Sequence, residues 1–226
     1  MKILSIDSCT EVISIALIVG KEITEKSFPS GKDFSENILP EITILLSESN
    51  LKIKDVDAIA FGSGPGSFTG IRIACGLAYG LAYANNLPIV GVSTLEALAL
   101  LSKRENSISC IDARMGQVYL GIYQNINGTI MPLIEPGLFN PSELPELPKL
   151  KKATVIGSGL NMYKKEFESQ YHNITLSYFT DKCTLAASIG ILSKSQFGKE
   201  FNLNKATPIY IRNKVAQTTE ERLNKK

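Results

Sequence analysis

A pattern of short apolar runs, which occurs twice along the chain, constrains the fold more than any other feature of the sequence. Residues 2–7 form an apolar run that ends at an acid, and residues 108–112 form a second one. The strand-like runs that follow these two acids are 12–19 and 22–28 in the first half, and 117–124 and 129–134 in the second. Runs rich in β-branched residues and bounded by turn residues are typical of strands. The sequence therefore predicts two lobes that each open with a three-stranded meander.

Helical and strand patterns alternate after the first meander. A helix is expected over 34–47, where Ile38, Ile42 and Leu45 recur at helical spacing. Residues 93–96 have the sequence of a capping box and predict another helix start. The remaining expected elements are strands at 56–61, 88–92, 153–156 and 174–178, helices at 71–84, 161–170 and 185–196, and an irregular proline-rich connection over 132–148.

Each lobe is expected to follow the order β-β-β-α-β-α, so the predicted fold class is α/β with two lobes. This plan resembles the duplicated ribonuclease-H-like fold of the actin, Hsp70 and sugar-kinase superfamily. We expect an N-terminal lobe over 1–104, which carries the partner-docking helices, and a smaller C-terminal lobe over 105–216. Residues 205–216 could pack back on the first lobe, and 217–226 are expected to form a frayed tail. Fold alone does not give function.

The balanced composition argues against several function classes. The chain has 24 basic and 22 acidic side chains, a net charge of +2, which argues against strong unaided binding to nucleic acid. The N-terminal apolar run is too short for a signal peptide, and the apolar helix at 70–84 is too short to span a bilayer and contains Arg72. We therefore expect a cytoplasmic protein that makes no membrane contact. The one histidine, His172, and four separated cysteines offer no metal site.

The two acids at the strand ends raise the question of a nucleotide site. In the actin-like superfamily such acids face the phosphates and the metal of a nucleotide, and here they would be Asp7 and Asp112. Ser8 and Thr10 could hydrogen-bond a phosphate oxygen, but the loop after Asp7 has no glycine to let backbone amides approach phosphate closely. These four residues are a candidate vestigial nucleotide site, with weak nucleotide contact and no cofactor expected. Alternatively, Asp7 and Thr10 only shape a turn between two strands.

A glycine-rich loop over residues 62–70 joins an expected strand to an expected helix. Because a helix N-terminus binds anions well, the loop invites comparison with phosphate loops. It has neither a Gly-Lys-Ser/Thr ending nor the G-x-G-x-x-G spacing, so it matches no phosphate-binding fingerprint. The favoured interpretation is a tight turn that needs several positive-φ positions, for which glycine is suited.

The helix expected at 71–84 carries small residues on several faces. Gly76 and Gly80 each cost about 1 kcal/mol of helix stability relative to alanine, so the helix is expected to bring its backbone close to another element. Two alternatives stay open at this point. The glycines could pack inside the protein's own core, or they could belong to a partner surface.

Four segments in the same order along the chain resemble the TsaB (YeaZ) family of bacterial tRNA threonylcarbamoyladenosine biosynthesis proteins. They are GPGSFTGIR at 64–72, GVSTL at 91–95, IDARMGQVY at 111–119 and PIYIRNKVA at 208–216. The loop motif alone is shared with the paralogous TsaD family, whereas the set is specific. The sequence departs from the family at residues 34–36, where Phe-Ser-Glu stands in place of the common His-Ser-Glu, and this makes independent metal binding still less expected.

The resemblance implies a role within a complex. It implies a non-catalytic subunit that docks on the catalytic subunit TsaD and acts with the ATPase TsaE, meeting tRNA only within the complex. The complex transfers a threonylcarbamoyl group onto the adenosine next to the anticodon in tRNAs that read codons beginning with A. The family pairs through its first-lobe helices and forms a homodimer through the same surface when TsaD is absent. The interface residues implied here are Ser35, Ile38, Ile42, Leu45, Arg72, Cys75, Gly76, Tyr79, Gly80 and Tyr83.

The rival hypothesis is an active enzyme. Asp7 and Asp112 motivate a nucleotide-dependent small-molecule kinase or ATPase of the actin-like superfamily. Tight binding of ATP and Mg²⁺ to the isolated chain would favour it over a docking subunit.

Overall fold

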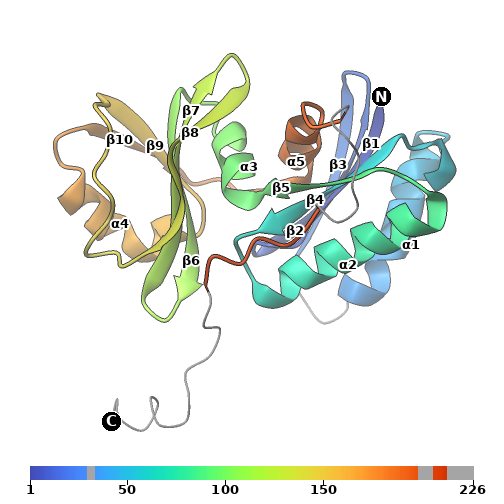
Figure 1. The fold of residues 1–226 in the computed structure, drawn as a ribbon, viewed down its shortest axis with the longest axis horizontal. Helices are drawn as coiled ribbons and strands as arrows, with labels where there is room; N and C mark the ends of the chain where they lie inside the picture. Colours follow the sequence, from blue (N-terminus) through green and yellow to red (C-terminus); the bar gives the residue numbers. More distant parts are fainter. Residues whose placement is uncertain (30–33, 198–205, 213–226) are drawn as a thin grey trace, which may run out of the picture.

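The computed structural model describes residues 1–29, 34–197 and 206–212, with 34–37 described as backbone only. Its strands form two five-stranded sheets, and each sheet is the centre of one lobe (Figure 1). The predicted tail at 217–226 and the two ends of the predicted segment 205–216 lie outside the described residues.

The first sheet has the strand order β3-β2-β1-β4-β5. Its strands are β1 (Lys2–Asp7), β2 (Val12–Val19), β3 (Glu22–Pro29), β4 (Ala58–Gly64) and β5 (Ile89–Ser93). The central strand β1 pairs with β2 antiparallel and with β4 parallel. Because helices cover both faces of this sheet, Ile3, Leu4 and Ile6 of β1 are completely buried.

The second sheet repeats the plan of the first, with the order β10-β9-β6-β7-β8. Its strands are β6 (Asn106–Arg114), β7 (Gln117–Ile126), β8 (Thr129–Phe139), β9 (Lys152–Ile156) and β10 (Thr175–Phe179). In both sheets the third, second, first, fourth and fifth strands of the lobe stand side by side in that order. The predicted α/β fold of two duplicated ribonuclease-H-like lobes is confirmed.

Two helices cover one face of the first sheet. They are α1 (Phe34–Glu48) and α2 (Phe68–Asn85), which pack with the short 3-10 helix η1 (Ile53–Asp55) on the apolar side chains of β1, β2 and β4 (Figure 1). None of the helices in the described part of the chain combines the length and the apolar character that a membrane span requires.

Of the remaining helices in the described chain, two lie between the lobes and one covers the second sheet (Figure 1). α3 (Thr94–Leu101) lies against β6 and β7, and α4 (Gly159–Gln170) lies against β6 and β9. α5 (Ala186–Ser193) follows the second-lobe strands in sequence but lies on the first sheet, against β1 and β2. The second sheet begins after residue 105, whereas α5 packs mainly on the first sheet, and the division into 1–104 and 105–216 stays a prediction. α3 and α5 contact each other in one apolar cluster with side chains of both sheets.

The second lobe departs from the predicted β-β-β-α-β-α order, because residues 140–151 form an irregular connection and no helix between β8 and β9. Leu144, Leu147 and Leu150 of this connection pack on the core of the second lobe and supply the apolar cover that a helix would give. The predicted start of the irregular stretch at residue 132 is also wrong, since β8 continues to Phe139 through two prolines. Proline is tolerated there because β8 is an edge strand.

The predicted capping box at 93–96 is wrong in its chemistry. Ser93 is the N-cap residue of α3, but its side chain makes no capping hydrogen bond. Ser67 performs this function at α2, where its hydroxyl accepts a hydrogen bond from the Gly70 amide. α2 consequently begins at Phe68, three residues before the predicted start.

The glycine-rich loop before α2 packs directly on the turn that joins β1 to β2. A Cβ at Gly70 would overlap the carbonyl oxygen of Ser8, and a Cβ at Gly66 would overlap that of Cys9. Hydrogen bonds hold the same contact, because the Ser67 amide donates to the Cys9 carbonyl over 2.8 Å and the Ser8 hydroxyl donates to the Gly70 carbonyl over 2.6 Å. Within 62–70 only Gly64 has a positive φ. The prediction of several positive-φ positions is therefore wrong. Close backbone approach explains Gly66 and Gly70, and the Asp7 carboxylate occupies the space beside Gly62.

Substitution of Gly70 by alanine tests this contact. We expect Gly70→Ala to lower the free energy of unfolding by about 3 kcal/mol, because the new methyl group must displace the backbone of Ser8. Gly76→Ala is the matched control in the same helix, where a Cβ meets no atom within 4 Å. It should raise stability by up to about 1 kcal/mol through helix propensity. Equal effects of the two substitutions in urea unfolding would contradict the packing described here.

Candidate functional site

The outer face of α2 carries the two glycines that the sequence left unexplained. Gly76 and Gly80 are exposed, and neither position has an atom within 4 Å of an added Cβ. The helix is held to the sheet by its other side, where Ala74, Ala78 and Ala82 are buried in the first-lobe core. Of the two alternatives, packing of the glycines in the protein's own core is therefore excluded.

The other predicted interface residues of α2 surround this glycine face. Arg72 and Tyr83 are exposed, and Tyr83 keeps 82% of its surface accessible. Cys75 and Tyr79 are half-buried against the core. Burial raises the pKa values of the Cys75 thiol and the Tyr79 hydroxyl, and the hydroxyl donates to the Ala206 carbonyl over 2.8 Å.

The structure corrects the prediction for α1. Ile38, Ile42 and Leu45 are buried to 3%, 3% and 0% exposure in the first-lobe core, so their side chains cannot belong to an exposed interface. The helical spacing that singled them out is the spacing of the inward face. Among the side chains described from residue 38 onward in α1, the large aliphatic ones that are exposed are Leu39 and Ile44, which sequence reasoning did not select. Ser35 lies in the first turn of α1, in the part described as backbone only.

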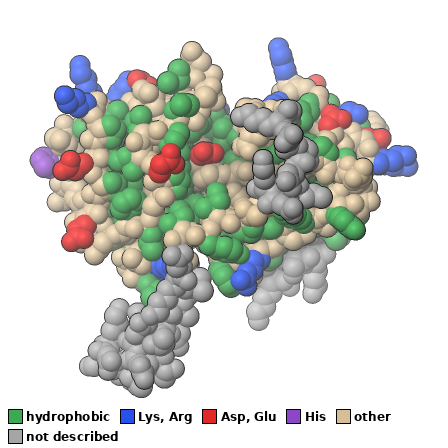
Figure 2. All heavy atoms as spheres, in the orientation of Figure 1, with side chains coloured by type: hydrophobic (Ala, Val, Ile, Leu, Met, Phe, Trp, Pro, Cys, Tyr) green, Lys and Arg blue, Asp and Glu red, His purple; other side chains and the backbone are tan. Residues whose placement is uncertain are grey.

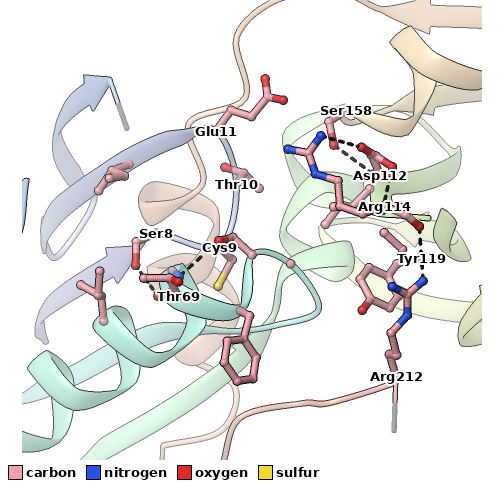
Figure 3. Close-up of a pocket in the computed structure, with 18 of the residues that line it drawn as sticks. Ser8, Cys9, Thr10, Glu11, Thr69, Asp112, Arg114, Tyr119, Ser158 and Arg212 are labelled. Atoms are coloured by element: carbon pink, nitrogen blue, oxygen red, sulfur yellow. Dashed lines mark hydrogen bonds and ion pairs between the residues drawn. The ribbon is translucent and has the colours of Figure 1, made fainter. Parts of the chain in front are cut away.

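A cleft of about 540 Å³ opens between the lobes. From the first lobe it is lined by the turn after β1 and the start of α2, and from the second lobe by the hairpin between β6 and β7 (Figure 3). The predicted nucleotide residues Ser8, Thr10 and Asp112 all line it. The structure thus brings together three of the four residues that were selected for this site.

The fourth residue, Asp7, does not line the cleft. It is completely buried, and its carboxylate lies against Gly62 and accepts a hydrogen bond from the Cys9 amide over 3.2 Å. The prediction that Asp7 faces a bound phosphate is therefore wrong for this structure, because the turn residues that follow it close over it. Burial raises the pKa of the Asp7 carboxyl from 3.8 to about 6, against the hydrogen bonds from Cys9 and Thr10, which lower it.

Two arginines line the cleft on the second-lobe side. Arg114 pairs with Asp112, with 3.2 Å between its Nη1 atom and the carboxylate Oδ2 atom. Arg212 donates to the Gln117 Oε1 atom over 2.6 Å and to the Arg114 carbonyl over 3.3 Å (Figure 3). Sequence reasoning treated Arg114 as a solvated charge and did not select Arg212. Arg114 lies in the segment IDARMGQVY and Arg212 in PIYIRNKVA, so their position in two of the segments that carry the family resemblance was the available signal.

Apolar and polar side chains both line the cleft. Within the described residues no group of three or more histidine, cysteine or acidic side chains is arranged to hold a metal. The buried thiols of Cys9 and Cys110 have pKa values raised by burial, which disfavours the reactive thiolate. Fold and site together define an actin-like, two-lobed α/β protein with an open helix face and a cleft whose first strand-end acid is sealed.

Comparisons with known proteins identify the family. The family model described as "TsaD: tRNA N6-adenosine threonylcarbamoyltransferase" matches residues 28–219. The chain is 33% identical over 184 residues to the tRNA threonylcarbamoyladenosine biosynthesis protein TsaB of Buchnera aphidicola subsp. Schizaphis graminum, covering 78% of this chain and 87% of that one. It is 42% identical over 123 residues to TsaB of Haemophilus influenzae, covering 53% of this chain and 52% of that one. The chain thus spans about half the length of that relative.

A solved structure agrees with these sequence matches. YeaZ from Pseudomonas aeruginosa superposes with a TM-score of 0.77 at 29% identity, covering 92% of this chain and 99% of that one. The chain belongs to the TsaB (YeaZ) family, as the four sequence segments predicted.

The pH dependence of stability tests the burial of Asp7. Because the pKa of Asp7 is about 6 in the folded protein and 3.8 as its ordinary value, the folded state holds this proton more tightly than the unfolded chain. The resulting stabilisation is complete below pH 3.8 and is lost as the pH rises through 6. Between pH 4.5 and 7.5 the loss is about 2 kcal/mol.

We expect Asp7→Asn to remove this loss, measured as the free energy of unfolding in urea at the two pH values. Asp181→Asn, which changes an exposed acid of the second lobe, serves as the control and should keep the pH dependence of the unsubstituted protein. An Asp7→Asn variant with unchanged pH dependence would show that Asp7 is solvated.

Proposed function

We propose that this chain is a non-catalytic subunit of the tRNA threonylcarbamoyladenosine machinery, and that it docks on TsaD through the outer face of α2. The relatives named TsaB are tRNA threonylcarbamoyladenosine biosynthesis proteins, and the matching family model describes a threonylcarbamoyltransferase. In this proposal the cytoplasmic complex also contains the ATPase TsaE. It transfers a threonylcarbamoyl group to the adenosine beside the anticodon of tRNAs that read codons beginning with A.

The observation that carries the proposal is the open space beside Gly76 and Gly80. A glycine inside a helix lowers helix stability by about 1 kcal/mol relative to alanine. Neither glycine is needed for packing within the chain, since alanine would fit at both positions. Small residues at such positions allow the backbone of a second helix to come close, and exposed Tyr83 offers the kind of aromatic side chain that dominates binding energy at interfaces.

The α1 side of the first lobe extends this surface. Leu39 and Ile44 expose 49% and 43% of their surfaces on α1, which packs in the same first-lobe core as α2. They replace Ile38, Ile42 and Leu45 as the α1 residues proposed to contact the partner. A second copy of the chain could use the same surface, which supports a homodimer when TsaD is absent.

The cleft supports a non-catalytic role more than the rival kinase or ATPase. A phosphate that approached the first turn would meet the backbone of Ser8–Thr10 already packed against the glycine-rich loop, and Asp7 lies behind that turn. Asp112 is neutralised by Arg114. On the face that Figure 2 shows, Asp and Glu side chains lie among the described Lys and Arg side chains, and this mixed charge supports contact with tRNA only within the complex.

The direct test of the proposed function is reconstitution. The chain should co-purify with TsaD, and a tRNA modification assay with TsaD and TsaE should depend on its presence. Product formed at the same rate without this chain would contradict the proposal.

A bulky residue on the glycine face should block docking while the fold stays intact. We expect Gly80→Leu to weaken binding to TsaD at least 100-fold, because the leucine side chain fills the space where the partner backbone approaches. The control is Lys165→Leu, which adds the same side chain to an exposed position of α4 in the second lobe. Calorimetric binding of both variants to TsaD, with circular dichroism for folding, makes the measurement. Equal affinity of Gly80→Leu and unsubstituted protein would show that this face is not the interface.

Calorimetry with ATP and Mg²⁺ separates the proposal from its rival. We expect the isolated chain to bind ATP no more tightly than about 1 mM, an affinity worth roughly 4 kcal/mol, because Asp7 is sealed from the cleft. Micromolar binding that is lost in Asp7→Ala would favour the kinase or ATPase instead.

A further inference from the structure

Residues 206–212 cross from the first lobe to the second as an extended segment, which we call the strap. In Figure 1 it runs from the region of α2 and β4 to β6, and its last residue, Arg212, lines the cleft. Its contacts fall into three groups, to the first-lobe core, to the outer face of α2, and to the second-lobe hairpin.

The first group fixes the strap to the first lobe. Ala206 is 4% exposed within the first-lobe core, and its carbonyl accepts a hydrogen bond from the Tyr79 hydroxyl over 2.8 Å. The Ile209 amide donates to the Ser63 carbonyl over 2.6 Å. The Ile209 backbone passes so close to Gly64 that a Cβ there would lie 2.9 Å from the Ile209 carbonyl oxygen.

The second group places the strap at the edge of the proposed docking face. The ring of Tyr210 lies 6.3 Å from the ring of Phe68, and its hydroxyl is 3.5 Å from the Nε atom of Arg72. The Arg72 guanidinium in turn stacks over the Phe68 ring at 3.6 Å. Phe68 and Tyr210 are 41% and 46% exposed, so a partner that covers the start of α2 would touch the strap.

The third group reaches the second lobe. Arg212 donates to the Gln117 side chain and to the Arg114 carbonyl, and its Nη1 atom lies 3.3 Å from the Met115 sulfur. All three acceptors belong to the hairpin between β6 and β7, which lines the cleft. Arg114 also forms an ion pair with Asp112, so Arg212 is hydrogen-bonded to a residue of the ion pair that lines the cleft.

We propose that the strap is a clamp that couples the α2 docking face to the second-lobe wall of the cleft. This inference rests on the proposed function for the identity of the docking partner. Tyr210 and Arg212 are two residues apart in an extended chain, which spans about 3.3 Å per residue. The hydrogen bond of Ile209 fixes one end of this short stretch, and the hydrogen bonds of Arg212 fix the other. A partner that displaces Tyr210 therefore also displaces Arg212.

Hydrogen exchange on the free full-length chain tests the clamp itself. In Arg212→Gln the guanidinium bonds are lost, and we expect the amides of residues 112–118 to exchange on the order of 10-fold faster, as loss of a hydrogen bond to a charged group predicts. Lys194→Gln is the control, because Lys194 is an exposed cation that donates to Gly20 away from the cleft. Unchanged exchange at 112–118 in Arg212→Gln would overturn the clamp.

The same experiment with TsaD added tests the coupling. In the unsubstituted chain we expect protection to increase on the outer turns of α2 and also at 112–118. In Arg212→Gln the protection of α2 should remain while the change at 112–118 disappears. Protection of α2 without any change at 112–118 in the unsubstituted chain would overturn the coupling and leave the docking proposal intact. If TsaD protects no segment of the chain, both the docking proposal and the coupling are overturned. The clamp is tested separately, by hydrogen exchange on the free chain.

Discussion

The rest of the structure depends on the contact between the turn at Ser8–Thr10 and the glycine-rich loop before α2. Two glycines without Cβ atoms let the two backbones touch, and the hydrogen bonds of Ser67 and Ser8 hold them there. This contact fixes the start of α2 against the centre of the first sheet, and it closes the space in front of Asp7. One packing arrangement therefore sets α2 in place and keeps Asp7 out of the cleft.

The inward and outward faces of α2 differ in composition and in exposure. The inward face of α2 is alanine-rich and supports the helix, while the outward face is kept open by glycines that the chain itself does not need. Ser8, Thr10 and Asp112 line the cleft, where Arg114 pairs with Asp112 and Arg212 hydrogen-bonds to the hairpin between β6 and β7. The strap contacts the start of α2 through Tyr210 and the cleft through Arg212.

Apolar runs and turn signals predicted the sheets of both lobes, because the central strands are buried almost continuously and are therefore apolar along their length. The position of α5 was not predictable, since its apolar residues suit either sheet and only the tertiary fold places it on the first. The same ambiguity explains the errors at the site. Helical spacing selected Ile38, Ile42 and Leu45 on the buried side of α1, and only the structure distinguishes that side from Leu39 and Ile44. Arg212 was missed because its partners lie about a hundred residues away.

The central claim is that the outer face of α2 meets the catalytic partner. A photo-crosslinking residue in place of Tyr83, which is 82% exposed, tests it most directly. The same residue in place of Met162, which is 61% exposed on α4, provides the comparison. The account predicts that the probe at position 83 forms a covalent adduct with TsaD and that the probe at 162 forms none. Adducts from position 162 alone, in a complex that still modifies tRNA, would contradict it.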